Sequence, residues 1–166
     1  SNILKKVKGS KLIIKCANKK LRFDRIEKIF KQNGVSNSVT FHQSIDKLED
    51  HLNLYREIDV ALDTFPYNGV TTSFEAIWMG VPVLTMAGYN FNSRCGESIN
   101  KNLNMERMVA KDEDDYVNKV VNLSNNNPDN YINLRKSIFV NALKSPLFNV
   151  QNYSKSFFEA LEGIVN

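Results

Sequence analysis

Short apolar runs alternate along the chain with longer segments of helical periodicity. The apolar runs cover residues 11–16, 38–41, 58–62 and 81–85, and the intervening segments cover residues 22–32, 46–56 and 72–79. In those segments the apolar side chains recur three or four positions apart, as on the buried face of a helix. Strands that are apolar throughout are typical of a parallel sheet with both faces covered. The pattern therefore predicts an α/β fold, a Rossmann-like parallel sheet with helices on both faces.

The second half of the chain is predominantly helical in pattern. We predict a short helix over residues 93–100, a last short strand at 108–110, and helices over 112–122, 129–144 and 152–165. Asparagine and proline residues at 125–128, and Ser145-Pro146, provide the breaks between the last three helices. No internal repeat or low-complexity linker divides the sequence, so we predict a single domain over residues 1–166.

The composition is that of a globular protein with a basic surface. The chain is 42% hydrophobic and 24% charged, with a net charge of +4 that comes largely from lysines and arginines before residue 26. This charge is compatible with a nucleic-acid-binding α/β domain, but dense basic runs and aromatic–basic clusters are absent, and we expect no nucleic-acid partner. A mildly basic surface equally suits a site for a diphosphate.

Neither membranes nor metals are indicated by the sequence. No apolar run is long enough to span a bilayer, and the first residues lack the apolar core of a signal peptide. We therefore expect no membrane partner and a cytoplasmic location. Cys16 and Cys95 match no metal or redox spacing and are predicted to be buried, reduced thiols.

The segment over residues 59–75 carries the strongest functional signal. An apolar strand ends at Asp63, a turn that includes Gly69 follows, and a helix is predicted to begin at Thr71 and Thr72. Ligands of open α/β sheets bind at the carboxyl ends of the strands, where such a turn would lie. Free N–H groups at a helix N-terminus favour an anion, and glycine allows close approach of the backbone. The segment thus suits a phosphate or diphosphate.

Glu75 follows Thr71 by about one helical turn and faces the same end of the helix. A carboxylate in that position can accept hydrogen bonds from both hydroxyl groups of a ribose. The alternative is that Thr71 and Thr72 only cap the helix and that Glu75 is a solvated residue of its first turns. The residues by themselves leave both interpretations open.

Residues 59–88, DVALDTFPYNGVTTSFEAIWMGVPVLTMAG, resemble the signature of the family 41 glycosyltransferases, which include animal O-GlcNAc transferase, plant SPINDLY and bacterial relatives. The similarity continues through residues 93–94, 103–111, 144–148 and Tyr153. It implies the C-terminal lobe of a GT-B glycosyltransferase, with a UDP-sugar as donor and a protein as acceptor. It also implies an N-terminal lobe, and helical repeats in some relatives, outside this chain.

The resemblance assigns roles to particular residues. It implies diphosphate binding by Gly69, Val70, Thr71 and Thr72, ribose binding by Glu75, uracil binding by His51, Asp46 and Lys47, and a place near the sugar or phosphates for Asn68 and Arg94. A lysine of the animal enzyme is replaced by Leu48, which leaves Lys47 as the candidate. Val70 stands where the animal enzyme has histidine, so the sugar is not specified.

Each assignment has a structural alternative. His51 is also compatible with a boundary position on an amphipathic helix, and Arg94 with a surface ion pair. Trp78, which shares its predicted helix with Phe74 and Ile77, is expected in the core.

The sequence leaves two functions open. The first is the donor-binding lobe of an enzyme that transfers GlcNAc or another hexose to protein side chains. No catalytic residue can be assigned, so the chain alone is expected to be inactive, and no metal or other cofactor is expected because helix N-terminal donors can stabilise the departing diphosphate. The second is a non-catalytic nucleotide-binding or interaction module of Rossmann-like fold.

Overall fold

The computed structural model describes residues 1–15, 23–43 and 45–165. The helices are α1 (Asn2–Lys6), α2 (Phe23–Gln32), α3 (Leu48–Leu54), α4 (Thr71–Trp78), α5 (Cys95–Asn102), α6 (Glu113–Ser124), α7 (Pro128–Lys144) and α8 (Val150–Val165). The strands are β1 (Leu12–Lys15), β2 (Val39–His42), β3 (Ala61–Leu62), β4 (Val83–Met86) and β5 (Val109–Ala110). The order of elements is the alternation that the sequence predicts.

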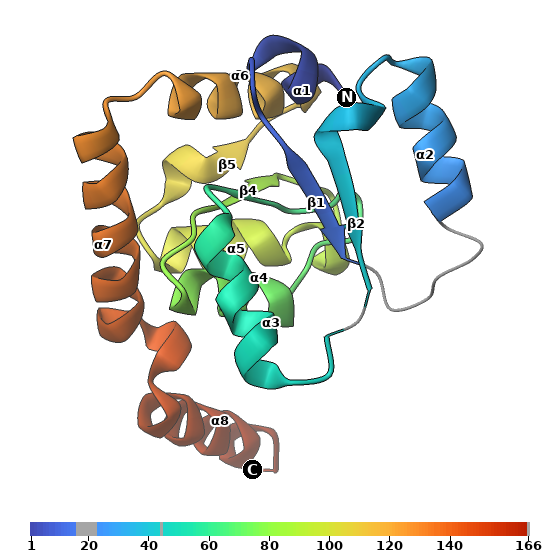
Figure 1. Ribbon diagram of the computed structural model, residues 1–166. Coiled ribbons are helices and arrows are strands. Elements are labelled where there is room, and N and C mark those ends of the chain that lie inside the picture. The colour runs from blue at the N-terminus through green and yellow to red at the C-terminus, as the bar shows by residue number, and fades with distance from the viewer. Residues whose placement is uncertain (16–22, 44, 166) are drawn as a thin grey trace.

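All paired strands run parallel. The strands hydrogen-bond in two groups, β1–β2 and β3–β4–β5, with β4 in the middle of the second group. Figure 1 shows α7 along one side of the molecule and α2 on the other, with the strands between them. Parallel strands flanked by helices confirm the predicted α/β class, while the division into two hydrogen-bonded groups was not predicted.

Strand β4 lies in the centre of the core, with α5 packed against it. Val83, Leu84 and Thr85 are all buried, which explains why this strand lacks alternating polar residues. Gly96, at the start of α5, is so close to Thr85 that a Cβ atom would collide with the threonine hydroxyl. One turn later, the Asn100 side chain donates to the Val83 carbonyl (3.1 Å). Helix α5 therefore starts at the carboxyl end of β4 and runs back toward its amino end.

The apolar core joins the sheet to α4, α5 and α7. Its most buried large side chains are Ile77, Leu84, Leu103 and Ile138. Burying an aliphatic side chain of this size stabilises a fold by about 2 kcal/mol. The core thus holds α4, through Ile77 near its end, against the sheet.

Trp78 lies outside this core, so its predicted burial was wrong. Its side chain is 45% exposed and packs against the rings of Phe139 and Phe148 at centroid distances of 5.5 Å. The apolar spacing of α4 correctly indicated a helix, but its last turn contributes to an aromatic cluster at the surface. Helix α8 extends away from the rest of the molecule (Figure 1), and its large apolar side chains are exposed.

The cysteine prediction was only partly testable. Cys95 is a free thiol, but it is partly exposed rather than buried, and its Sγ atom contacts the Phe91 carbonyl oxygen at 3.2 Å. Cys16 lies outside the described residues. Among the helices described, none has the length and apolar character needed to cross a membrane.

Candidate functional site

Asp63 anchors the turn between β3 and α4 to the sheet. One carboxylate oxygen accepts the Gly69 N–H (2.7 Å), and the other accepts the hydroxyl of Thr85 on β4 (2.8 Å). The hydroxyl of Tyr116 donates to the Asp63 carbonyl oxygen (2.9 Å). Burial raises the pKa of the Asp63 carboxyl group, although the hydrogen bonds from Gly69 and Thr85 oppose that rise. A single carboxylate therefore fixes the turn against two strands.

Asn68 fastens the same turn to α5. It is buried, its Nδ2 donates to the Thr64 carbonyl (2.8 Å), and its Oδ1 accepts the Gly96 N–H (3.1 Å). Both polar atoms of the side chain are thus used by the backbone of the protein. The expected place of Asn68 near the sugar or phosphates stays a prediction, and its observed role is to hold the turn.

Gly69 lets the turn fold closely onto the beginning of α4. A Cβ atom there would collide with the Thr72 hydroxyl oxygen and would lie 3.3 Å from that of Ser73. The Gly69 N–H already donates to Asp63, whereas the Gly69 carbonyl accepts the Ser73 hydroxyl (3.1 Å). Donors available to a ligand therefore come from the residues after Gly69.

The N-terminus of α4 presents donors that the helix does not use. Val70 is the N-cap residue and makes no side-chain capping bond, and the first N–H that bonds back to the helix is that of Phe74 (3.0 Å to Val70 O). Thr71 and Thr72 lie inside the helix and are exposed, so the alternative that they cap it was wrong. The first N–H groups of a helix lack intrahelical partners and carry the positive end of its dipole. This end of α4 can therefore bind an anion.

Glu75 and His51 are brought together beside this helix end. His51 Nε2 lies 2.8 Å from Glu75 Oε2, and the hydroxyl of Tyr55 donates to the same oxygen (3.1 Å). On the other side of the ring, Lys15 Nζ lies 2.6 Å from His51 Nδ1. Burial, followed by the nearby charge of Glu75, raises the pKa of Tyr55 well above its usual range. Glu75, the predicted ribose residue, and His51, one of the predicted uracil residues, thus share one hydrogen-bonded cluster.

The remaining predicted residues lie at the surface. Asp46 and Lys47 are exposed just before α3, the helix that carries His51. Arg94 donates to Glu97 (2.9 Å), which also accepts from Lys101 (2.7 Å). The hydrogen bond from Lys101, followed by that from Arg94, lowers the pKa of Glu97. Arg94 therefore makes the surface ion pair that was its structural alternative, and its role near a phosphate stays a prediction.

Sequence reasoning missed three residues that organise the site. Asp63 was recognised only as a strand end, and Tyr55 and Lys15 were given no role. Lys15 is the last residue of β1, and Asp63 directly follows β3. Because parallel strands bring their carboxyl ends to one edge, strand-end polar residues were a usable signal. Tyr55 could have been found from its position four residues after His51, about one helical turn.

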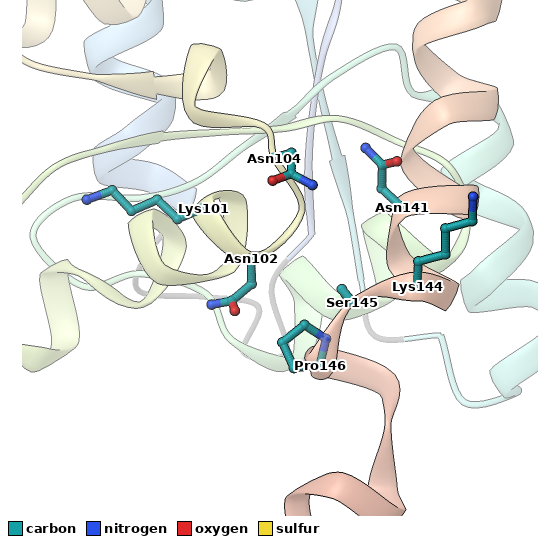
Figure 2. A pocket seen from close by; sticks show the side chains of 7 residues that line it. All are labelled: Lys101, Asn102, Asn104, Asn141, Lys144, Ser145 and Pro146. Atoms are coloured by element: carbon teal, nitrogen blue, oxygen red, sulfur yellow. The ribbon is translucent and has the colours of Figure 1, made fainter.

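A cavity of about 370 Å³ lies elsewhere, where the ends of α5 and α7 meet. It is lined by Lys101, Asn102, Asn104, Asn141, Lys144, Ser145 and Pro146. Figure 2 shows that Lys101 and Lys144 extend in opposite directions and do not converge on a common point. Since α5 runs back from the carboxyl end of β4, this cavity lies toward the amino end of the sheet. Its lysines are close to helix C-termini, whose negative dipole ends they offset.

Comparisons with known proteins identify relatives of this chain. A family model for glycosyl transferase family 41 matches residues 1–157. A probable UDP-N-acetylglucosamine–peptide N-acetylglucosaminyltransferase SPINDLY of Solanum lycopersicum is 34% identical over 94% of this chain and 17% of its own length. A UDP-N-acetylglucosamine–peptide N-acetylglucosaminyltransferase of Caenorhabditis elegans is 30% identical over 78% of this chain and 11% of its own length.

The fold has a match among solved structures. A mutant of the Thermobaculum terrenum O-GlcNAc transferase superposes with a TM-score of 0.76 and 27% sequence identity, covering 83% of this chain and 26% of that chain. This similarity confirms the predicted GT-B fold class. The chain spans about 17% of the length of the SPINDLY proteins it matches.

Proposed function

Because the chain belongs to glycosyl transferase family 41, we propose that the turn between β3 and α4 binds the nucleoside diphosphate of a UDP-sugar. The longer protein would transfer N-acetylglucosamine or another hexose to protein side chains. One observation carries this proposal: unused donors at the start of α4 lie one helical turn from the carboxylate of Glu75. A diphosphate needs donors and a ribose needs an acceptor, and this helix end supplies both.

Each group of the nucleotide has assigned partners. The N–H groups after Gly69, together with the hydroxyls of Thr71 and Thr72, would donate to the diphosphate. Glu75 would accept hydrogen bonds from the ribose hydroxyls. His51 would contact the uracil, and so would the segment at Asp46 and Lys47. His51 has 13% of its side chain exposed, so a base would meet only one edge or face of its ring.

The chain provides the donor half of a transferase site. Transfer leaves negative charge on the departing diphosphate, and fixed N–H and hydroxyl donors at the α4 N-terminus would stabilise it without a metal ion. We assign the binding of the acceptor protein, and the remaining catalytic groups, to other segments of the longer protein, including an N-terminal lobe and helical repeats. On this proposal the isolated chain binds UDP but transfers no sugar, and the protein is cytoplasmic.

Calorimetric titration of the chain with UDP, UMP, ADP and a short RNA tests the proposal. We expect UDP to bind more tightly than ADP or RNA, with no change on addition of EDTA. Glu75→Ala should weaken UDP binding about tenfold or more, because a ribose hydroxyl loses a charged acceptor. Glu113→Ala, which removes an exposed carboxylate on α6, is the matched control and should bind as the parent does. Absence of UDP binding at millimolar nucleotide would refute the site.

A second variant separates the two halves of the nucleotide. Thr72→Val removes one hydroxyl donor with little change in volume, so it should weaken UDP binding while leaving the weaker binding of uridine unchanged. Glu75→Ala should weaken both ligands. If Thr72→Val weakened uridine as much as UDP, the assignment of the diphosphate to the start of α4 would be wrong.

A further inference from the structure

Lys15 is the outermost member of a hydrogen-bonded chain that crosses three elements. Its ammonium group extends from the carboxyl end of β1 to His51 Nδ1 on α3 (2.6 Å), and His51 Nε2 contacts Glu75 Oε2 on α4 (2.8 Å). The two contacts occupy both ring nitrogens. The ring also packs edge-on against Tyr55, with a centroid distance of 5.6 Å. The orientation of His51 is thus fixed from three directions.

The chemistry of the two end groups decides where the imidazole proton lies. An ammonium group has only donors, so Nδ1 must offer its lone pair to Lys15. A carboxylate has only acceptors, so Nε2 must carry the proton that Glu75 accepts. Together they select the neutral His51 tautomer with its hydrogen on Nε2, a selection that Glu75 alone would make less completely because it equally accepts from a doubly protonated ring.

This arrangement divides the work of the Glu75 carboxylate between its two oxygens. Oε2 accepts from both His51 and Tyr55. Within the part of the chain that the structure describes, these are the side-chain donors to Glu75, and Oε1 has none. The Glu75 side chain is 24% exposed. One oxygen is therefore held by the protein, and the other remains for a ligand.

We propose that Lys15 is a positioning residue of the nucleotide site: it fixes the Nε2–H tautomer of His51, which holds Glu75 so that Oε1 faces the ribose hydroxyls. The part that concerns ribose rests on the proposed function. The part that concerns His51 does not, since it needs only the three side chains. When Lys15 is removed, only Glu75 still opposes the Nδ1–H tautomer, in which an Nε2 lone pair faces and repels the Glu75 oxygen, and nothing excludes the doubly protonated ring.

Nitrogen-15 NMR of the imidazole rings tests the tautomer directly and without nucleotide. The chain has two histidines, so a His42→Gln variant assigns the His51 signals. We expect Nδ1 of the parent chain to show the shift of an unprotonated ring nitrogen and Nε2 that of an N–H. Lys15→Met should move both signals toward a mixture of forms, while Lys15→Arg, which keeps a donor, should restore the parent pattern. Lys11→Met, which removes an exposed lysine just before β1, is the matched control.

UDP titration of the same variants tests the consequence for the ligand. We expect Lys15→Met to weaken UDP about fivefold, and Lys15→Arg and Lys11→Met to stay within about twofold of the parent. A protonated Nδ1 in the parent, or His51 signals unchanged in Lys15→Met, would overturn the proposal. Changed signals with unchanged UDP affinity would overturn its ribose part alone. If the parent chain bound no UDP, the proposed function and the ribose part would both fail, while the His51 signals would still decide the role of Lys15.

Discussion

The two ends of the β3–β4–β5 sheet use polar side chains in opposite ways. At the carboxyl end, partly buried Asp63 and buried Asn68 bond to the backbone of the turn and to α5. At the amino end, exposed Lys101 and Lys144 lie in the last turns of α5 and α7, around an open cavity. At the carboxyl end, these side chains hold the backbone of the protein in place. At the amino end, exposed positive charges interact with the C-terminal ends of two helices.

This difference explains why the carboxyl end is the better candidate for a site. Donors at the start of α4 stay unused because Asp63 and Asn68, rather than Thr71 and Thr72, hold the turn in place. A preorganised set of unused donors binds an anion without the free-energy cost of rearranging the backbone. The lysines around the cavity are exposed, so solvent screens their charges, and they already lie close to the negative ends of helix dipoles.

The largest effect is expected from removing the anchor of the carboxyl end. Asp63→Ala leaves the Gly69 N–H and the Thr85 hydroxyl without their acceptor, so the free energy of unfolding should fall by about 3 kcal/mol. Urea denaturation followed by circular dichroism measures it. Asp114→Ala, on the exposed face of α6, is the control and should change stability by less than about 0.5 kcal/mol. If Asp63→Ala also lowered the free energy of unfolding by less than about 0.5 kcal/mol, other contacts would hold the turn.

A smaller effect concerns pH. Because burial raises the pKa of Asp63 above its usual value of 3.8, the folded chain binds this proton more readily than the unfolded chain. The contribution of Asp63 to stability is therefore full below that usual value and is lost as the pH rises through the folded-state pKa. In Asp63→Asn, whose Nδ2 can donate to the Thr85 hydroxyl, the loss should be absent. Urea midpoints of both proteins across the acidic range measure the difference, and equal slopes would contradict it.

Glu97 provides an internal contrast to that measurement. Its pKa is lowered by Lys101 and Arg94, so its contribution is present above the usual glutamate range and is lost as the pH falls. The two carboxyl groups thus change stability with opposite signs in acid. Subtracting the Asp63→Asn curve from the parent curve removes the share of Glu97, which both proteins retain.

The sequence was sufficient for the architecture and for the turn, because both depend on local patterns. Apolar runs located the strands, and the turn residues before Thr71 located the start of α4. The α/β class followed from the alternation alone, whereas the GT-B lobe was implied by the resemblance. The nucleotide-binding role of Glu75 was predicted only from the resemblance, because a threonine pair followed by a glutamate also occurs at helices that bind no ligand.

Contacts between distant segments could not be read from local patterns. Glu75 contacts His51 of α3 and Tyr55, the residue that follows α3, and His51 contacts Lys15 from the first strand. Only packing of the folded chain brings these groups within hydrogen-bond distance. The error at Trp78 has the same origin, because helical spacing cannot tell a core position from a surface cluster that α7 and the following turn complete.

The smallest effect is expected at the amino end of the sheet. Lys144→Met removes an exposed charge from the last turn of α7, where it interacts with the helix dipole, so the free energy of unfolding should change by less than about 0.5 kcal/mol. UDP affinity should not change, because this residue lines the cavity at the opposite end from α4's first turn. Denaturation and titration under the conditions used for Asp63→Ala make the two ends directly comparable. A loss above about 1 kcal/mol, or weaker UDP binding, would mean that the lysines at this end support the nucleotide site, and the contrast between the two ends of the sheet would no longer hold.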